Sequence, residues 1–374
     1  MDSKARNQQE GIDEVEQSQG TTEAPTIVSR AELAAVHETA NTLIGQLAEL
    51  PDGPIVGQIV ATALKLLRDQ TNRGDIKLIN KSFQEMRYAL KVFAPYREVR
   101  KVSIFGSART REDHPDYHMA SEFGRAMADA GWMVMTGAGG GIMAAGHGGG
   151  GAERSFGLAI RLPFEQKTND FIANDPKLVN FKYFFTRKLM FVRFSHAIAL
   201  FPGGFGTMDE GFEVLTLIQT GKSVPMPIVL IEADRSGYWE SWQDYVENHL
   251  LARGLISEPD LRLYKIATTI EEASHEIRHF YSNYHSIRFT RDEMVMRLHR
   301  PPNDKQLQEI NEMFGDLLEK HLAGRPNAFR VSAPLAVERD EPALAHLPRL
   351  VFGFNRRDHG RLRILIDYLN NLPA

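Results

Sequence analysis

Short apolar runs alternate with longer segments whose apolar residues recur every three or four positions, from residue 96 to residue 285. The short runs predict buried strands, and the periodic segments predict amphipathic helices. The predicted strands are 99–105, 132–136, 156–162, 196–201, 228–231 and 264–267, and the predicted helices are 116–130, 187–194, one opening at Thr207, 239–253 and 270–284. Strands that alternate with helices favour a parallel sheet, so residues 96–285 are predicted to form an α/β, Rossmann-like, doubly wound domain.

Helical periodicity also precedes this region. The sequence from Ser29 to Glu32 reads as a capping box before a first helix, and two further helices are predicted at 55–71 and 76–93. Residues 29–95 are therefore predicted to be a helical N-terminal region that acts as a cap or an oligomerisation layer. Residues 1–28 are acidic and polar, and a disordered tail is expected because they cannot bury enough apolar surface to offset their ordering entropy.

The pattern after residue 285 is less regular and predicts a small α+β appendage over 286–374. Strands are expected at 287–289, 329–331 and 349–354, with helices at 304–322 and 360–369. Five arginines gather here beside Phe352 and Phe354, namely Arg349, Arg356, Arg357, Arg361 and Arg363. Such a cluster is usually a solvated face, and a site for an anionic effector or a partner subunit is the alternative.

Composition sets broad limits on the class of protein. The chain has 374 residues, of which 43% are hydrophobic and 25% charged, as in an ordinary globular protein. A net charge of −4 gives no general signal for nucleic acid or membrane binding. There is no cysteine, no apolar run long enough to cross a bilayer and no signal-peptide pattern, so a cytoplasmic protein is expected.

Three glycine-containing turns follow predicted strands. They are Gly106-Ser107, the run Gly139, Gly140 and Gly141 that leads to Met143, and Pro202-Gly203-Gly204-Phe205-Gly206. The last turn precedes a helix whose Thr207-Met-Asp-Glu210 start reads as a capping box. Glycines allow the backbone to approach an anion, and a helix N-terminus attracts one. Because the carboxyl ends of parallel strands meet at one edge, the three turns predict a single phosphate-binding site.

Two cations begin the helix before the central strand. If Thr186 caps that helix, Arg187 and Lys188 lie in its first turn, where they oppose the helix dipole. The residues that follow are apolar on nearly every side, which predicts a buried helix. The two cations are therefore expected to face a polar cavity that holds an anion, and a snorkelling surface pair is the alternative.

Other common chemistries have weaker signals. The glycine run fits only a variant of the dinucleotide fingerprint, and the nearest acid, Glu165, comes late. The Walker pattern and the Gly-x-Ser-x-Gly elbow are absent. His114 and His118 have a metal-ligand spacing, but Pro115 lies between them, so a surface helix start is predicted and no metal site.

The combined motifs resemble the LONELY GUY (LOG) family over residues 99–280. The Pro202–Glu210 run matches the family signature P-G-G-x-G-T-x-x-E, and Arg187-Lys188 falls where the family has its Arg-Lys pair. The serine turn at Gly106 and the Met turn at Met143 also coincide. The sequence departs from the family at Ala138, in a Thr-Gly-Ala approach to the turn, and in the glycine-rich segment 146–151. The N- and C-terminal extensions resemble those of the longer bacterial members.

The resemblance implies a nucleoside 5′-monophosphate phosphoribohydrolase that releases adenine, or an N6-substituted adenine, from AMP or a cytokinin nucleotide. It assigns catalysis to Glu210 and Arg187. Glu213 lies one helical turn from Glu210, and the two carboxylates are expected to raise one another's pKa. The substrate contacts that the resemblance implies are Gly106, Ser107, Gly139, Gly140, Gly141, Met143, Lys188, Pro202, Gly203, Gly204, Gly206, Thr207 and Glu213.

No cofactor and no metal are required by this scheme, and no residue independently suggests the pyridoxal phosphate chemistry of the label lysine decarboxylase that the family often carries. A nucleotide sensor or carrier without turnover is the main alternative, since it would share the phosphate loop. A nicotinamide-dependent oxidoreductase is a weaker one. A homodimer or larger homo-oligomer is expected from the apolar helices of the N-terminal region.

Overall fold

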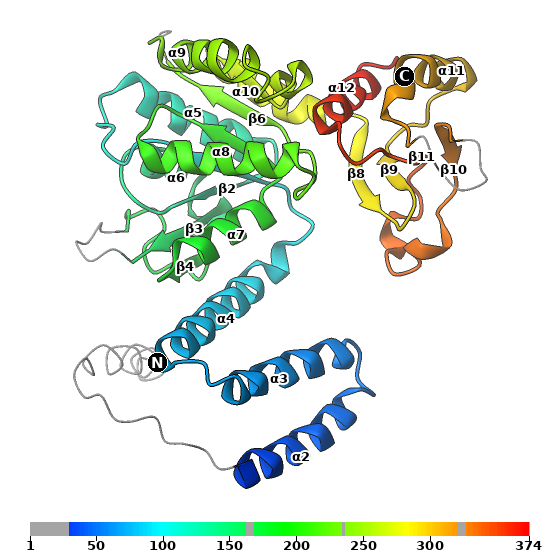
Figure 1. Ribbon diagram of the computed structural model, residues 1–374. Helices are drawn as coiled ribbons and strands as arrows, with labels where there is room; N and C mark the ends of the chain where they lie inside the picture. The colour runs from blue at the N-terminus through cyan, green and yellow to red at the C-terminus, as the bar shows by residue number, and fades with distance from the viewer. Residues whose placement is uncertain (1–29, 162–167, 234–235, 320–326, 374) are drawn as a thin grey trace. The chain divides into compact units, whose positions relative to one another are not determined.

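The computed structural model describes residues 30–161, 168–233, 236–319 and 327–373 (Figure 1). The predicted tail, the predicted cap Ser29, the strand end Leu162 and the acid Glu165 lie outside the described residues. The chain divides into two compact units, Met1–Lys81 and Ser82–Ala374. Within the described residues, no helix combines the length and apolar character that crossing a membrane requires.

The first unit is helical, as predicted. Helices α2 (Arg30–Leu47) and α3 (Gly53–Arg68) pack closely, because a β-carbon at Gly57 would lie 3.1 Å from Cγ2 of Ile44. Helix α4 (Arg73–Phe93) starts in this unit and continues into the second. These three helices confirm the predicted helical preface.

The second unit contains a seven-stranded sheet with the order β4-β3-β2-β1-β5-β6-β7. Every neighbouring pair is parallel, which confirms the doubly wound prediction. The strands are β1 (Lys101–Phe105), β2 (Met133–Thr136), β3 (Ser155–Ile160), β4 (Leu178–Phe181), β5 (Ala197–Leu200), β6 (Ile228–Ile231) and β7 (Tyr264–Ala267). The edge strand β4 was not predicted, because it is four residues long and contains the exposed Asn180.

The strand order reverses between β1 and β5. The chain runs outward from β1 through β2 and β3 to β4, and then returns to place β5 on the other side of β1. At such a point the connections after the two central strands diverge to opposite faces of the sheet, which leaves a crevice at the strands' carboxyl ends. The turns at Gly106 and Pro202 follow these two strands.

Helices cover both faces of this sheet (Figure 1). One core cluster joins alternate strand residues to α5 (Pro115–Asp129), α6 (Ile142–Gly150) and α10 (Ile270–Phe280). The other joins the opposite strand faces to the end of α4 and to α7 (Phe184–Phe194), α8 (Phe205–Gln219) and α9 (Tyr238–Tyr245). Helix α9 continues as one π-helical segment, Val246–Leu251, within the predicted 239–253 helix.

The glycine-rich segment 146–151 belongs to the contact between α5 and α6. A β-carbon at Gly149 would lie 1.8 Å from the carbonyl oxygen of Ser121, and one at Gly124 would lie 2.5 Å from the carbonyl oxygen of Gly146. Side chains at these positions would force the two helix backbones apart. The glycines at these positions therefore serve the packing of α5 against α6.

An antiparallel four-stranded sheet follows, with the order β10-β11-β9-β8. Its strands are β8 (Tyr284–Phe289), β9 (Met294–Leu298), β10 (Arg330–Ser332) and β11 (Arg349–Phe352), and its helices are α11 (Asp304–Met313) and α12 (His359–Asn370). The predicted α+β appendage is confirmed, although β9 was missed and the helix expected over 270–284 ends at Phe280.

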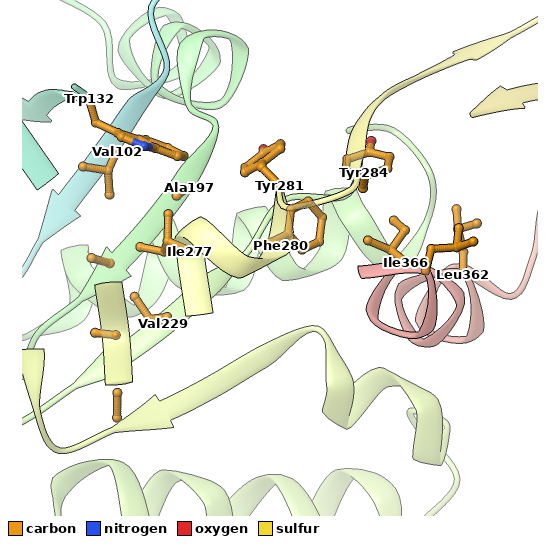
Figure 2. Close-up of a cluster of buried hydrophobic side chains, with 14 of the residues drawn as sticks. Val102, Trp132, Ala197, Val229, Ile277, Phe280, Tyr281, Tyr284, Leu362 and Ile366 are labelled. Carbon is orange, nitrogen blue, oxygen red and sulfur yellow. The ribbon is translucent and has the colours of Figure 1, made fainter. Parts of the chain in front are cut away.

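One hydrophobic cluster connects the appendage to the parallel sheet. Figure 2 shows it passing from Val102 and Val229 in the sheet, through Phe280 at the end of α10, to Leu362 on α12. Tyr281 follows the end of α10, Tyr284 begins β8, and both are buried in the same cluster. Because these side chains are shared, the appendage is part of the core of the second unit.

Most arginines of the predicted cluster have partners in the second unit and so do not form the expected solvated face. Arg349 is buried and lies 3.3 Å from the buried carboxylate of Glu338. Arg363 is buried as well and pairs with Glu276 and Asp367. Arg361 pairs with Asp316 at 3.0 Å, and Arg356 donates to the carbonyl oxygens of Thr290 and Arg291. The partners of these four arginines thus lie within the second unit, and Arg356 and Arg357 are the exposed members of the five.

Candidate active site at the strand-order reversal

The three predicted turns meet at the carboxyl edge of the parallel sheet. The backbone N–H of Ser107, after β1, donates to the carbonyl oxygen of Pro202, after β5, at 3.1 Å. The N–H of Ile142, at the start of α6, donates in turn to the carbonyl oxygen of Ser107 at 3.1 Å. Backbone hydrogen bonds therefore hold the turns after β1, β2 and β5 against one another.

Close approach of these backbones requires glycine at particular positions. A β-carbon at Gly203 would lie 2.1 Å from Oγ1 of Thr207, and one at Gly106 would lie 2.7 Å from the side chain of Ile142. Gly141 has a φ of +58°, and its β-carbon would lie 2.3 Å from the carbonyl oxygen of Ser107. These three glycines are therefore required by the fold itself.

Gly204 and Gly206 are different, because a β-carbon at either would meet no described atom within 4 Å. Helix α8 begins between them, at Phe205, with Gly204 as its N-cap. The predicted cap Thr207 is wrong: it lies inside the helix, and its N–H donates to the carbonyl oxygen of Gly204 at 3.1 Å. Since a glycine cap has no side-chain acceptor, the first N–H groups of α8 are left for another acceptor, as in anion-binding helix starts.

Helix α7 carries Arg187 and Lys188 and begins at Phe184, with Tyr183 as its N-cap. The proposed cap Thr186 is again inside the helix, and its hydroxyl donates to Oε2 of Glu85 at 2.7 Å. The other carboxylate oxygen of Glu85 accepts from the N–H of Lys182 at 2.7 Å. Glu85 is a buried residue of α4, so the last helix of the preface fixes the start of the helix that bears the cations.

The prediction that α7 is buried on nearly every side is wrong for one face. Met190 and Phe191 are buried, but Phe184, Phe185 and Leu189 are each about half exposed at 55%, 53% and 49%. The exposed side contains apolar residues that periodicity alone cannot assign to the core.

Arg187 and Glu210 come together from α7 and α8. Nη2 of Arg187 lies 3.9 Å from Oε1 of Glu210, and the two side chains are only 14% and 6% exposed. Nε of Arg187 and Oε2 of Glu210 are buried, and neither has a hydrogen-bond partner among the described residues. The distance is too long for a hydrogen bond, so both charged groups keep binding capacity that the protein does not use.

The guanidinium also reaches the turn after β2. Nη1 of Arg187 lies 3.6 Å from the position that a β-carbon of Gly137 would take, and Sδ of Met143 lies 2.8 Å from it. Arg187 additionally lies over the ring of Phe184, with 5.2 Å from Cζ to the centroid. The structure thus brings the predicted residues of α7, α8 and the Met143 turn into one place.

Burial raises the pKa of the Glu210 carboxyl above its usual value. The positive charges of Arg187 and Lys188 oppose this shift, and the negative charges of Asp209 and Glu213 add to it. Burial likewise lowers the pKa of Arg187, although a guanidinium stays charged in proteins. A raised carboxyl pKa next to a cation is typical of a group that accepts a proton during a reaction.

Lys188 faces acidic side chains of α8. Its Nζ lies 2.6 Å from Oδ2 of Asp209 and 3.5 Å from Oε2 of Glu213. Burial lowers the pKa of Lys188, but the hydrogen bond to Asp209 and the nearby carboxylates outweigh burial and raise the pKa. Lys188 and Glu213 therefore contact each other, while Asp209 is a partner that the sequence did not single out.

Sequence reasoning also missed Tyr238 at the start of α9. Its hydroxyl donates to the carbonyl oxygen of Gly203 at 2.6 Å, and its backbone N–H donates to Glu232 at 3.0 Å. Tyr238 thereby fixes the outer side of the Pro202–Gly206 turn. It follows a strand with no motif of its own, so no sequence signal marks it.

His114 is a helix cap, as expected. Its Nδ1 accepts from the N–H of Asp116 at 3.1 Å at the start of α5. Among the described residues, no group of three His, Cys, Asp or Glu side chains could hold a metal ion.

Part of the chain is similar to a known family. A family model described as "Possible lysine decarboxylase" matches residues 139–277, from the Met143 turn to α10. The cytokinin riboside 5′-monophosphate phosphoribohydrolase LOG of Oryza sativa subsp. japonica is 29% identical over 98 residues. The matched part of the chain is similar to the LOG family. The match to the rice LOG protein spans 26% of this chain and 39% of the rice protein.

Solved structures resemble part of the chain. An X-ray structure of a structural-genomics target is 22% identical, with a TM-score of 0.36, and the match covers 48% of this chain and 99% of the target. The molybdenum cofactor carrier protein from Chlamydomonas reinhardtii is 19% identical, with a TM-score of 0.34, and the match covers 48% of this chain and 97% of the carrier.

The residues of this candidate site do not fit the pyridoxal phosphate chemistry that the label lysine decarboxylase implies. That chemistry needs a lysine that becomes neutral and attacks the cofactor's aldehyde. Lys188, the lysine of the family motif, is instead held between Asp209 and Glu213, which favour its protonated form. No reaction step is therefore assigned to that cofactor.

Two alanine substitutions in the Pro202–Gly206 turn should separate an effect on stability from an effect on ligand binding. Gly203→Ala places a β-carbon against Thr207 and should lower the free energy of unfolding by about 1–3 kcal/mol. Gly204→Ala meets no described atom and should leave stability within about 0.5 kcal/mol, but it should weaken AMP binding by about tenfold or more if the phosphate lies there. Thermal denaturation and calorimetric titration with AMP measure the two effects. Unchanged AMP affinity in a folded Gly204→Ala variant would contradict the assignment of this turn.

Proposed function

We propose that this protein hydrolyses the N-glycosidic bond of nucleoside 5′-monophosphates, AMP or N6-substituted AMP, to a free base and ribose 5-phosphate. The observation that carries the proposal is the buried Arg187–Glu210 pair, whose Nε and Oε2 atoms lack partners among the described residues. Similarity to the rice phosphoribohydrolase LOG over part of the chain supports the same reaction class.

The substrate phosphate binds at the Pro202–Thr207 turn in this proposal. Gly204 and Gly206 leave open space there, and the start of α8 offers N–H groups and the positive end of the helix dipole. Arg187 adds a charge-assisted hydrogen bond to phosphate or ribose. The base and ribose then lie toward Gly106, Ser107, Gly139, Gly140, Gly141 and Met143.

Glu210 acts on the anomeric carbon. As the C1′–N bond breaks, its electron pair leaves with the base, which takes a proton from solvent, and positive charge develops on the ribose. The Glu210 carboxylate stabilises this charge and accepts a proton from the attacking water, whose oxygen bonds to C1′. The low exposure of Glu210 strengthens this interaction, because few water molecules screen it.

Turnover of AMP tests the proposal. Chromatography of AMP incubated with the protein should show free adenine, and Glu210→Gln should reduce kcat by about 10²–10⁴-fold. The neutral variant should fold and be at least as stable at pH 7. This follows because burial raises the pKa of Glu210, so its ionised form is disfavoured in the folded state above the unfolded pKa. Asp209→Asn, at a side chain that is 62% exposed, is the control and should retain most activity.

Adenine release that is equal in wild type and Glu210→Gln would refute the assignment. AMP binding without any product would instead identify a nucleotide sensor or carrier, which is the alternative function for this site.

The acid limb of the pH profile reports the Glu210 carboxyl. Because the pKa of Glu210 is raised, kcat/KM should fall as the pH drops through a value above that of an ordinary glutamate. Glu213→Gln removes a negative charge that raises this pKa, so the acid limb should move to lower pH. Glu271→Gln, an exposed change on α10 at the opposite face of the sheet, is the control and should leave the limb in place. If the acid limb of the Glu213→Gln variant moves to higher pH or stays fixed, the limb reports a group other than Glu210.

The protein is further proposed to form a homodimer or larger homo-oligomer. Apolar side chains are exposed on α7 and α8 beside the site, namely Phe184, Phe185, Leu189, Phe205 and Phe212. Phe205 is 98% exposed at the very start of α8. Large apolar side chains grouped on one face favour burial against another chain. A cytoplasmic location and the absence of nucleic-acid partners stay predictions from the sequence.

Phe205→Asp should therefore shift the protein toward the monomer in sedimentation velocity measurements. The charged side chain opposes burial in an apolar interface. Leu255→Asp, at an apolar residue that is 65% exposed outside this group, should leave the assembly state unchanged. If wild type is monomeric, or if Phe205→Asp assembles as wild type does, this face is not the interface.

A further inference from the structure

The turn between β2 and α6 contains an alanine in an unfavourable backbone conformation. Ala138 has a φ of 62°, in the left-handed region, where a β-carbon approaches the following carbonyl oxygen. The residue is buried, and its methyl group packs in a small cluster with Ala159 and Ile172. The surrounding structure must therefore hold the turn in place, because the local backbone preference opposes it.

Two backbone groups of Ala138 are fixed by polar partners. Its N–H donates to Oγ1 of Thr136 at 3.0 Å. Its carbonyl oxygen accepts from the backbone N–H of Asn169 at 2.9 Å. The side chain of Asn169 then reaches the next residue of the turn, where Nδ2 donates to the carbonyl oxygen of Gly139 at 2.9 Å.

His147 on α6 orients this asparagine. The imidazole is fully buried, with Nε2 3.0 Å from the carbonyl oxygen of Phe156 and Nδ1 3.2 Å from Nδ2 of Asn169. A carbonyl oxygen can only accept, so Nε2 carries the proton and Nδ1 accepts one from Asn169. The amide of Asn169 thus uses one N–H for His147 and the other for Gly139. Burial lowers the pKa of His147, which agrees with a neutral ring.

The turn held in this way borders the proposed nucleotide site. Gly137 precedes Ala138, and the position of a β-carbon on Gly137 lies 2.8 Å from Sδ of Met143 and 3.6 Å from Nη1 of Arg187. The side-chain hydrogen bonds of Asn169 among the described residues go to the turn and to His147, and none goes to Arg187 or Glu210. Any effect of Asn169 on a ligand would therefore pass through the backbone of residues 137–141.

We propose that Asn169 is a positioning residue for the nucleotide pocket: oriented by His147, it holds Ala138 and Gly139 in the conformation that shapes the pocket floor. The identity of the ligand rests on the proposed function, whereas the role of Asn169 in the turn does not. Position 138 is alanine in this chain, whereas the family pattern has glycine there. Glycine would adopt the left-handed conformation freely, so alanine at this position needs the hydrogen bonds from Asn169 to hold it.

A double-mutant cycle tests the clamp. Asn169→Ala removes the hydrogen bond to Gly139 and should raise KM for AMP by about three- to tenfold, with kcat changed by less than about twofold. Hydrogen exchange at the amides of Ala138 and Ile142 should accelerate by a similar factor. Ala138→Gly relieves the backbone strain, so in the double variant both the KM for AMP and the exchange rates should return most of the way to wild-type values. This rescue is the result that a direct contact between Asn169 and substrate would not give.

Asn169→Asp keeps the size of the side chain but cannot donate to Gly139. It should show the same rise in KM and the same faster exchange, and it replaces Asn169→Ala if that variant does not fold. Unchanged exchange in both asparagine variants, or a raised KM that Ala138→Gly fails to rescue, would overturn the proposal. If wild type releases no adenine from AMP, the proposed function fails, and the exchange measurements still decide whether Asn169 holds the turn.

Discussion

The site depends on keeping a guanidinium and a carboxylate buried close together without letting them pair fully. At 3.9 Å, Arg187 and Glu210 lower each other's desolvation cost but do not form the short bidentate contact that would satisfy both. A closed pair would be more favourable for the protein alone, and it would leave no free atoms for a substrate. Stability given up at such a place is typical of functional sites.

Each member of the pair is held by a different part of the chain. Glu85 of α4 fixes the first turn of α7 and so sets the position of Arg187. The Gly203 turn fixes the start of α8, and Tyr238 holds that turn from the outside. The two helices cover the same face of the sheet, so the reversal of strand order places a rigid support under both. Small relative movements of α7 and α8 are thereby limited.

The parallel sheet and its glycine turns could be predicted because their signals are local. Buried strands form short apolar runs, and a turn such as Pro202–Gly206 is marked by the glycines that its close backbone contacts require. Arg187 and Glu210 were predicted from the family motif to act at one site, and the structure places Nη2 of Arg187 3.9 Å from Oε1 of Glu210.

The remaining features depend on contacts between distant residues. Thr186 and Thr207 look like caps, but Tyr183 and Gly204 occupy the cap positions, and each helix starts two residues or more before the expected position. The hydroxyl of Thr186 instead donates to Glu85, a residue distant in sequence. The arginines of the appendage look exposed in sequence, because nothing nearby in the chain announces partners such as Glu338 or Glu276. Short strands such as β4 and β9 are defined by pairing with neighbours, which periodicity does not register.

Electrostatics on α8 explains why Glu210 rather than a neighbouring acid is the candidate for the proposed chemistry. Asp209 and Glu213 flank it in sequence, but Lys188 occupies both through contacts of 2.6 and 3.5 Å. Their charges still act on Glu210 and raise its pKa, while Lys188 keeps the local charge from becoming strongly negative. The adjacent cations of α7 therefore have separate roles. Lys188 neutralises the more exposed acids, and Arg187 stays beside the buried carboxylate with a nitrogen free for the substrate.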